Sequence, residues 1–367
     1  MGDRAGRGVI GRAPGRRPTI HDVARAAAVS PATVSNVLTG RRYVDPELAA
    51  RVRHSVDALG YRRDVAASTL RSAQRTVIGV IVPELRNPFF AEMVERLKQE
   101  AQKAGRHLLV ATSGSDPAQE LHQTEAIIAW RPAGLIFVPC DGSFPARALL
   151  EREGIPFVVL DRPIDDDAGV DTVAVDNLAA AREGAARLLA AGHRRILLVV
   201  SAVSIGNVRE RVAGVDEAVA AVPGAMVELL EAGLELDDIA AAVAARVART
   251  PRPTAVFTAN NVLTLGTLKA ITDLGIEVPG QISLLGFDDY DWMEVFRPRL
   301  CAIRQPVAEM AHAAWERLAV LTGVSPMGES PSTCHVRLPC SLAWRDSVAP
   351  PRASASAKHP KELVLPP

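Results

Sequence analysis

The sequence predicts two kinds of structure in one chain: a small all-α segment near the N-terminus and a larger α/β body with parallel sheets in two lobes. Short helical patterns separated by turn signals occupy residues 19–62, whereas beyond residue 76 continuous apolar runs alternate with amphipathic helical patterns. The chain has 367 residues, of which 48% are hydrophobic, so it is long enough for more than one domain with its own core.

The first two helical patterns are separated by a short break. Thr19 can act as an N-cap, and the apolar residues that follow it recur at helical spacing. After the break, Ser30 and Pro31 provide an N-cap and a first-turn proline for a second helix. Two short helices at this spacing indicate a helix-turn-helix, which presents its second helix to the major groove of DNA. The alternative for this pattern alone is an ordinary helical hairpin in a core.

The second helix has an inward and an outward side. Val34, Val37 and Leu38 fall on the inward side. The other positions, together with the two residues at the helix starts, are candidates for contacts with double-stranded DNA: Thr19, Ser30, Pro31, Ala32, Thr33, Ser35 and Asn36. Asn36 has the chemistry to bond N6 and N7 of adenine.

A third helix is predicted from Asp45 and Pro46 to Gly60, and a short, weak one over Val65–Leu70. Residues 19–70 together resemble the headpiece of the LacI/GalR family of bacterial transcription regulators. That headpiece reads TI-DVA--A-VS--TVS-VLNG, then V----R--V------LGY-PN-VA--L, and nearly every position is filled here. One departure is Thr39, where asparagine is usual; the other is the Arg-Asp pair at 63–64 in place of Pro-Asn.

The resemblance implies how the headpiece binds DNA. Two hinge helices from a homodimer meet on a palindromic operator, and a leucine from each wedges between base pairs in the minor groove. Leu70 occupies that position.

Charge divides along the chain in the same way as the predicted folds. Residues 1–75 contain 14 Lys and Arg against 6 Asp and Glu, a net charge of +8, so the remaining residues carry −8 in a chain that is neutral overall. A basic head on an acidic body indicates a polyanionic partner for the head alone.

The body alternates strands and helices, which predicts parallel sheets covered on both faces. The predicted strands are Val77–Val82, His107–Ala111, Leu135–Pro139, Phe157–Leu160, Thr172–Val175, Ile196–Val200, Ala255–Thr258 and Ile282–Leu285. The predicted helices are Phe89–Ala104, Glu120–Trp130, Leu178–Ala191, Glu210–Ala221, Val262–Leu274 and Val307–Leu321.

The body is similar to the two-lobed, periplasmic-binding-protein-like (type I) sensor domain of the same family, and the resemblance covers about residues 18–347. The expected organisation is a flexible basic tail (1–17), a helix-turn-helix domain (18–63), a hinge helix and linker (64–75), an effector-binding and dimerisation domain (76–347) and a disordered tail (348–367).

The resemblance implies an effector site between the lobes. The matching positions are Phe89, Phe90, Asp161, Asp176, Arg211, Asn260 and Asp288. Two of them have a structural alternative: Phe90 is equally consistent with packing in its helix, and Asp176 with capping the next one. Convergent polar groups beside aromatic rings favour a sugar or another polyol.

The sequence therefore predicts a cytoplasmic, homodimeric regulator, a repressor controlled by a sugar-like effector, with no cofactor. One alternative is a sugar-acting enzyme of similar fold, but the chain has no GxSxG, P-loop, HExxH or GxGxxG motif in the required context. The other alternative is an exported solute-binding receptor, against which stand the headpiece and an N-terminus without an apolar signal region. No run approaches 18 apolar residues, so no membrane span is expected.

Overall fold

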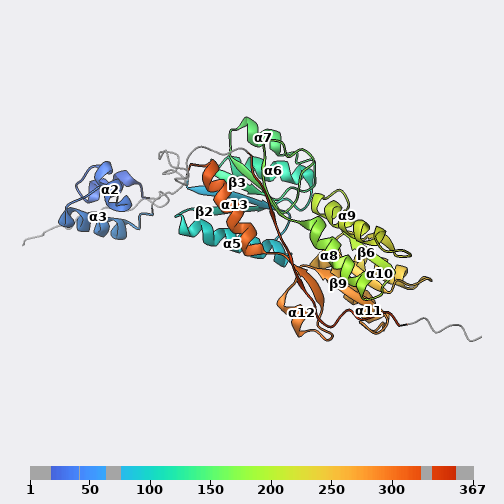
Figure 1. Cartoon of the computed structure of the whole chain (residues 1–367). Coiled ribbons are helices and arrows are strands. Elements are labelled where there is room, and N and C mark those ends of the chain that lie inside the picture. Colours follow the sequence, from blue (N-terminus) through green and yellow to red (C-terminus); the bar gives the residue numbers. More distant parts are fainter. Residues whose placement is uncertain (1–17, 41, 63–75, 324–332, 353–367) are drawn as a thin grey trace, which may run out of the picture. The chain divides into compact units, whose positions relative to one another are not determined.

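The computed structural model of the chain describes residues 18–40, 42–62, 76–323 and 333–352. It divides into two compact units, Met1–Gln74 and Arg75–Pro367, each described by itself (Figure 1). The expected basic tail and the expected hinge helix with Leu70 lie outside the described residues.

Three helices make up the described part of the first unit: α1 (Ile20–Ala26), α2 (Pro31–Thr39) and α3 (Pro46–Leu59). Each begins at a side chain that accepts a hydrogen bond from a backbone amide left unpaired by the helix. Thr19 and Asp22 form a capping box on α1, and Ser30 Oγ accepts from the Thr33 amide at 3.0 Å. Asp45 caps α3 in the same way. The helix-turn-helix expected from the sequence is confirmed.

The core of this unit takes one central side chain from each helix. Val23, Val34 and Val52 are 0% exposed and belong to one hydrophobic cluster. Because these three side chains pack in the same cluster, the side of α2 that carries Val34 faces inward, and its other side faces solvent.

The second unit contains two six-stranded sheets, one in each lobe. The first sheet, in the order β11-β5-β4-β3-β1-β2, comprises β1 (Val77–Val82), β2 (His107–Thr112), β3 (Gly134–Phe137), β4 (Phe157–Leu160), β5 (Asp171–Val175) and β11 (His335–Leu338). The second sheet, in the order β12-β10-β9-β8-β6-β7, comprises β6 (Arg195–Val200), β7 (Met226–Glu231), β8 (Ala255–Thr258), β9 (Ser283–Phe287), β10 (Cys301–Arg304) and β12 (Ser341–Ala343). Strand pairs in the described residues are parallel except β10 with β12.

Helices cover both faces of each sheet, as the predicted alternation requires (Figure 1). In the first lobe, α5 (Pro88–Lys103) and α13 (Val307–Leu321) cover one face, and α6 (Pro117–Ile128) and α7 (Arg147–Arg152) the other. In the second lobe, the pairs are α8 (Asn177–Ala190) with α9 (Gly206–Ala220) and α10 (Leu236–Val247) with α11 (Asn261–Asp273), and the short α12 (Asp291–Val295) follows β9. None of the described helices is long and apolar enough to cross a membrane.

The chain passes between the lobes three times. The first crossing, at Asp176, joins β5 to α8; the second, at Gln305 and Pro306, joins β10 to α13; the third, at Pro339 and Cys340, joins β11 to β12. Because each crossing contains only one or two residues, rotation about these few backbone bonds can change the angle between the lobes.

The predicted α/β organisation is confirmed, and β1, β4, β8 and α13 have the expected bounds. The pattern of apolar residues did not predict α7, β7, α10, α12 or the last three strands. Strands β10 to β12 have only three or four residues, and β7 is an edge strand with four of its six side chains exposed, so none of them produces a continuous apolar run.

The boundary at residue 348 that was expected for the disordered tail lies too early in the chain. Val348 packs against the core of the second lobe. Ser283 Oγ accepts from the Ala349 amide and donates to the Ala349 carbonyl, both at 3.1 Å. These contacts extend the second lobe to residue 352, and residues 353–367 lie outside the described chain.

Candidate functional site

The second helix of the first unit presents a polar side to solvent. Val34 is fully buried. Of the residues around it that were expected to contact DNA, Ala32 is exposed and the others are half-buried: Pro31, Thr33, Ser35 and Asn36. This side of α2 is therefore accessible to a partner.

Thr19 and Ser30 hold the helix starts. Thr19 Oγ1 donates to Asp22 Oδ2 at 2.7 Å, and the Ser30 and Thr33 hydroxyls are hydrogen-bonded at 2.9 Å. Both side chains thus fix the first turn of their helices, α1 and α2, through hydrogen bonds within that turn. Tyr43, in the segment before α3, is 89% exposed.

A small cleft of about 40 Å³ lies between the lobes of the second unit. Six of the seven residues expected to bind an effector line it: Phe89, Phe90, Asp161, Arg211, Asn260 and Asp288. The first three come from the first lobe and the others from the second. Asp161 and Asp288 directly follow β4 and β9, and Asn260 lies two residues after the end of β8. Ligands of open parallel sheets bind at this place, outside the carboxyl ends of the strands.

Asp176 is the candidate that the structure places elsewhere. Its exposed side chain caps α8, with Oδ1 accepting from the Ala179 amide at 2.9 Å, and it does not line the cleft. The next residue, Asn177, is 0% exposed and contacts Arg211. Adjacent positions of a helix point about 100° apart. The capping alternative for Asp176 is therefore the one that the structure supports, and its neighbour Asn177 faces inward.

Phe89 and Phe90 line the cleft and also pack in the core of the first lobe. Their rings meet edge to face with centroids 5.2 Å apart, and both are at most 5% exposed. The Arg162 guanidinium lies 5.7 Å from the centroid of Phe90 and donates to the carbonyls of Pro139 and Cys140. The two readings of Phe90 are therefore compatible.

Two carboxylates of the cleft belong to residues whose backbone conformation is strained. Asp161 and Asp288 follow β4 and β9 directly and have φ values of +69° and +71°. Non-glycine residues seldom adopt this left-handed conformation, and they concentrate at functional sites when they do. Both side chains are nearly buried, 2% and 5% exposed.

Burial determines the acidity of these carboxylates. Desolvation raises the pKa of Asp161 to about 6, against the opposing charges of Arg211 and Arg162. Desolvation likewise raises the pKa of Asp288, although Arg211 and the hydrogen bonds from Gln305 and the Asn261 amide act in the other direction.

Arg211 is the donor of the cleft. Its guanidinium stacks 3.6 Å from the centroid of Phe287, Nε donates to Asn177 Oδ1 at 2.9 Å, and Nη1 donates to the Ala259 carbonyl at 2.6 Å. Nη2 is buried without a hydrogen-bond partner. Three contacts thus fix the guanidinium, and one donor nitrogen, Nη2 with its two N–H groups, is left for a ligand.

Two acceptors complement this donor. Asp161 Oδ1 and Gln305 Oε1 are also buried without a hydrogen-bond partner, and both residues line the cleft. An unpaired buried polar atom costs about 1–3 kcal/mol. A small ligand that both donates and accepts, as a hydroxyl-rich molecule does, would recover that free energy.

Polar contacts join the lobes around the cleft. Asn207 Nδ2 donates to Asp161 Oδ2 at 3.2 Å, and Asn261 Nδ2 donates to Asn87 Oδ1 at 3.1 Å. Arg209 is 44% exposed and forms an ion pair with Asp165. The sequence analysis missed Asn207, since a single asparagine at the start of a helix carries no periodic signal.

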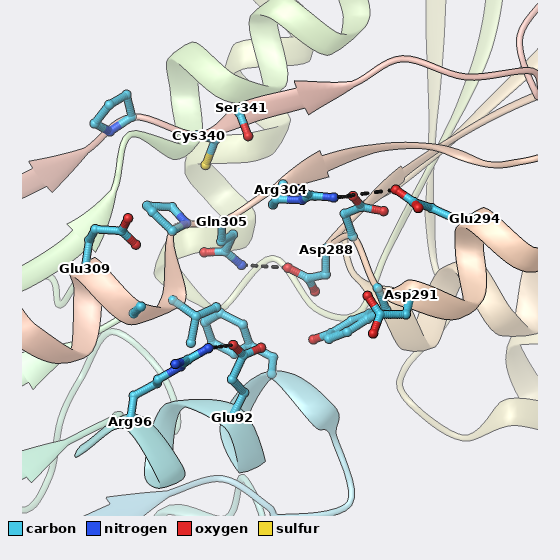
Figure 2. Close-up of a pocket in the computed structure, with 17 residues that line it drawn as sticks. Glu92, Arg96, Asp288, Asp291, Glu294, Arg304, Gln305, Glu309, Cys340 and Ser341 are labelled. Atoms are coloured by element: carbon cyan, nitrogen blue, oxygen red, sulfur yellow. Dashed lines mark hydrogen bonds and ion pairs between the residues drawn. The ribbon is translucent and has the colours of Figure 1, made fainter. Parts of the chain in front are cut away.

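A larger cavity of about 880 Å³, lined by Glu92, Arg96, Asp291, Glu294, Arg304 and Glu309 among others, lies beyond the wall formed by Asp288 and Gln305 (Figure 2). In this wall Gln305 Nε2 donates to Asp288 Oδ1 at 2.7 Å. Several charged groups of the cavity already pair with one another, such as Arg96 with Glu92. The cleft, where buried polar atoms are left unpaired, is therefore the better candidate site. Among the described residues, no group of His, Cys, Asp and Glu is arranged to hold a metal ion.

Comparison with known proteins agrees with these two parts of the chain. Residues 19–64 match the bacterial regulatory proteins of the lacI family, and residues 75–314 match the periplasmic binding proteins and sugar binding domain of the LacI family. The transcriptional regulator PtxS of Pseudomonas putida is 32% identical over 304 residues, which cover 82% of this chain and 88% of PtxS. The ribose operon repressor of Haemophilus influenzae is 28% identical over 305 residues, covering 82% of this chain and 90% of the repressor.

Solved structures show the same fold. The crystal structure of the lac repressor dimer bound to operator and the anti-inducer ONPF superposes with a TM-score of 0.79 at 24% identity, covering 91% of this chain and 100% of that one. The headpiece, the two-lobed body and these matches lead to one conclusion: the chain belongs to the LacI family of bacterial regulatory proteins, and it is a DNA-binding transcriptional regulator.

Proposed function

We propose that this regulator is a cytoplasmic, homodimeric repressor that binds a palindromic operator and responds to a sugar-like effector in the cleft. The observation that carries the proposal is the cleft itself, where one donor of Arg211 and acceptors of Asp161 and Gln305 are buried without partners. A hydroxyl-rich ligand matches this combination of donor and acceptors.

The relatives support a sugar as the effector. One of them is named as a ribose operon repressor, and solved structures with the same fold include a regulator from Enterococcus faecium with bound ribose and a complex of CelR with cellobiose. The carboxylates of the cleft then hold ligand hydroxyls, with no chemical step required of them.

On the DNA side, we assign base contacts to the accessible side of α2: Pro31, Ala32, Thr33, Ser35 and Asn36. Thr19 and Ser30, whose hydroxyls cap α1 and α2, place these helices and their amides against the phosphates. Leu70, outside the described residues, is the proposed minor-groove wedge.

On the effector side, we assign ligand contacts to the six cleft residues and exclude Asp176. Asp161 faces the cleft from the first lobe, whereas Arg211, Asn260 and Asp288 face it from the second. A ligand that contacts both walls stabilises the closed arrangement over an open one, and this difference in binding free energy is the condition for allosteric control.

A two-step experiment tests the proposal. Thermal-shift screening of the full chain against pentoses, hexoses, sugar acids, polyols and nucleobases identifies the effector, and operator titration with and without it measures the response. We expect a sugar or polyol to raise the melting temperature and to change operator affinity by about 5- to 150-fold. An effector that binds without any change in operator affinity would contradict the regulatory role.

A further inference from the structure

Glu210 precedes Arg211 on α9, but its carboxylate contacts the first lobe rather than the cleft. Its Oε1 is 2.9 Å from Nη2 of Arg337, and its Oε2 accepts from Nη1 of Arg337 at 2.9 Å. This is a two-pronged pairing of carboxylate and guanidinium, the geometry that gives arginine pairs their directionality. Because Arg337 lies on β11 and Glu210 on α9, the pair joins the two lobes beside the third crossing.

The same carboxylate also determines the orientation of a buried amide. Glu210 Oε2 accepts from Asn177 Nδ2 at 2.9 Å, and the Val175 carbonyl accepts from the same nitrogen at 3.2 Å. An asparagine amide has donors on the nitrogen only. With Nδ2 facing these two acceptors, the oxygen of Asn177 faces Arg211.

That oxygen is one of the groups that hold Arg211. It accepts from Arg211 Nε at 2.9 Å, while Arg211 Nη1 reaches the Ala259 carbonyl at 2.6 Å. If the amide of Asn177 were reversed, its NH₂ group would face the N–H of Arg211 Nε, and two donors would oppose each other. The guanidinium would then leave its place beside Ala259.

We propose that Glu210 is a positioning residue that acts through Asn177 to hold the guanidinium of Arg211 toward the cleft, and that its pairing with Arg337 ties this orientation to the arrangement of the lobes in which the pair forms. Because the same carboxylate contacts both Asn177 and Arg337, the orientation of the ligand-facing donor and the contact between the lobes depend on each other. The ligand role of Arg211 rests on the proposed function, whereas the geometry of the relay does not.

Hydrogen exchange of the ligand-free full-length chain, followed by mass spectrometry, tests the relay at two segments. Residues 338–341 report the third crossing, and residues 259–261 report the turn that receives Arg211 Nη1. In Glu210→Ala we expect exchange to be about tenfold faster at both segments, as for the loss of a hydrogen bond to a charged group. Exchange of the β6 amides normalises for global stability.

Glu217→Ala is the matched control. Glu217 lies on the same helix and pairs with Arg182 on α8 at 3.3 Å, within the second lobe, so its loss should leave both segments unchanged. The exchanged pair Glu210→Arg with Arg337→Glu restores the charges across the lobes but places a donor beside Asn177 Nδ2. We therefore expect this double variant to protect residues 338–341 and to leave residues 259–261 fast.

Two results would overturn the proposal. In the first, Glu210→Ala behaves like Glu217→Ala at residues 259–261, which would show that Glu210 does not reach Arg211. In the second, the exchanged pair protects the turn as well as the crossing, which would reduce Glu210 to a charge partner. Because neither operator nor effector is present, these results do not depend on whether the proposed function is correct.

Discussion

Replacing Asp161 by asparagine should make the second unit more stable at neutral pH. The carboxylate is 2% exposed, and burial raises its pKa from the ordinary 3.8 to about 6. Between pH 3.8 and about 6 the carboxyl group is protonated in the folded state but ionised in the unfolded chain. The free energy of unfolding therefore falls as pH rises through this interval. The difference corresponds to roughly 3 kcal/mol at pH 7.5, because each pKa unit is worth 1.36 kcal/mol.

Urea unfolding between pH 4 and pH 7.5, followed by tryptophan fluorescence, measures this free energy. All four tryptophans lie beyond residue 75, so the signal reports the second unit and not the headpiece. The Asp161→Asn side chain has the same size and no charge, so we expect its unfolding free energy to match the wild type near pH 4 and to exceed it by up to about 3 kcal/mol at pH 7.5.

Asp176→Asn is the control for this comparison. Asp176 is exposed and caps α8, and asparagine caps helices about as well as aspartate. Wild-type and Asp161→Asn curves that run parallel across the whole pH range would show that Asp161 is not a strained, buried anion, and the electrostatic reasoning about the cleft would fail with it.

Three further predictions concern DNA binding and response. Operator affinity of the full chain should fall steeply with salt, by roughly 0.9 log units per log unit of salt for each phosphate neutralised, and a fragment that begins at Thr76 should not bind the operator. Fluorescence anisotropy measures both affinities. Operator binding by the fragment would refute the assignment of DNA binding to the head. Asn36→Ala should lose about 1–3 kcal/mol of discrimination at one base pair of each half-site while non-specific binding is nearly unchanged, so an unchanged consensus after in vitro selection would count against that contact. Asp288→Ala removes the acceptor of the Asn261 amide and of Gln305; it should keep basal operator affinity but lose the effector response, and calorimetry showing wild-type effector affinity would move the site elsewhere.

Local rules explain what the sequence could predict. Thr19, Ser30 and Asp45 start their helices through contacts two or three residues away, so each cap is visible in the sequence itself. Asp161 and Asp288 follow buried strands directly, and the ends of parallel strands meet at one edge of a sheet. These rules predicted the organisation of the body, and the family resemblance added to them predicted six of the residues that line the cleft.

The contacts that the sequence could not predict join residues far apart in the chain. Asn207 reaches Asp161 across 46 positions, and Glu210 reaches Arg337 across 127. Whether Asp176 or Asn177 faces inward depends on the exact rotation of α8 at its first turn, which the pattern of apolar residues does not fix to one position.

The three crossings also determine the order in which the lobes can be completed during synthesis. Strands β6 to β10 follow one another in the chain, so the second lobe lacks only β12 and the segment after it, residues 344–352, once the ribosome has passed Arg304. The first lobe begins earlier but still lacks α13, which covers one face of its sheet, and the edge strand β11. A nascent chain therefore exposes the apolar face of its earlier lobe until α13 has been made, and a premature stop directly after residue 304 leaves both lobes incomplete.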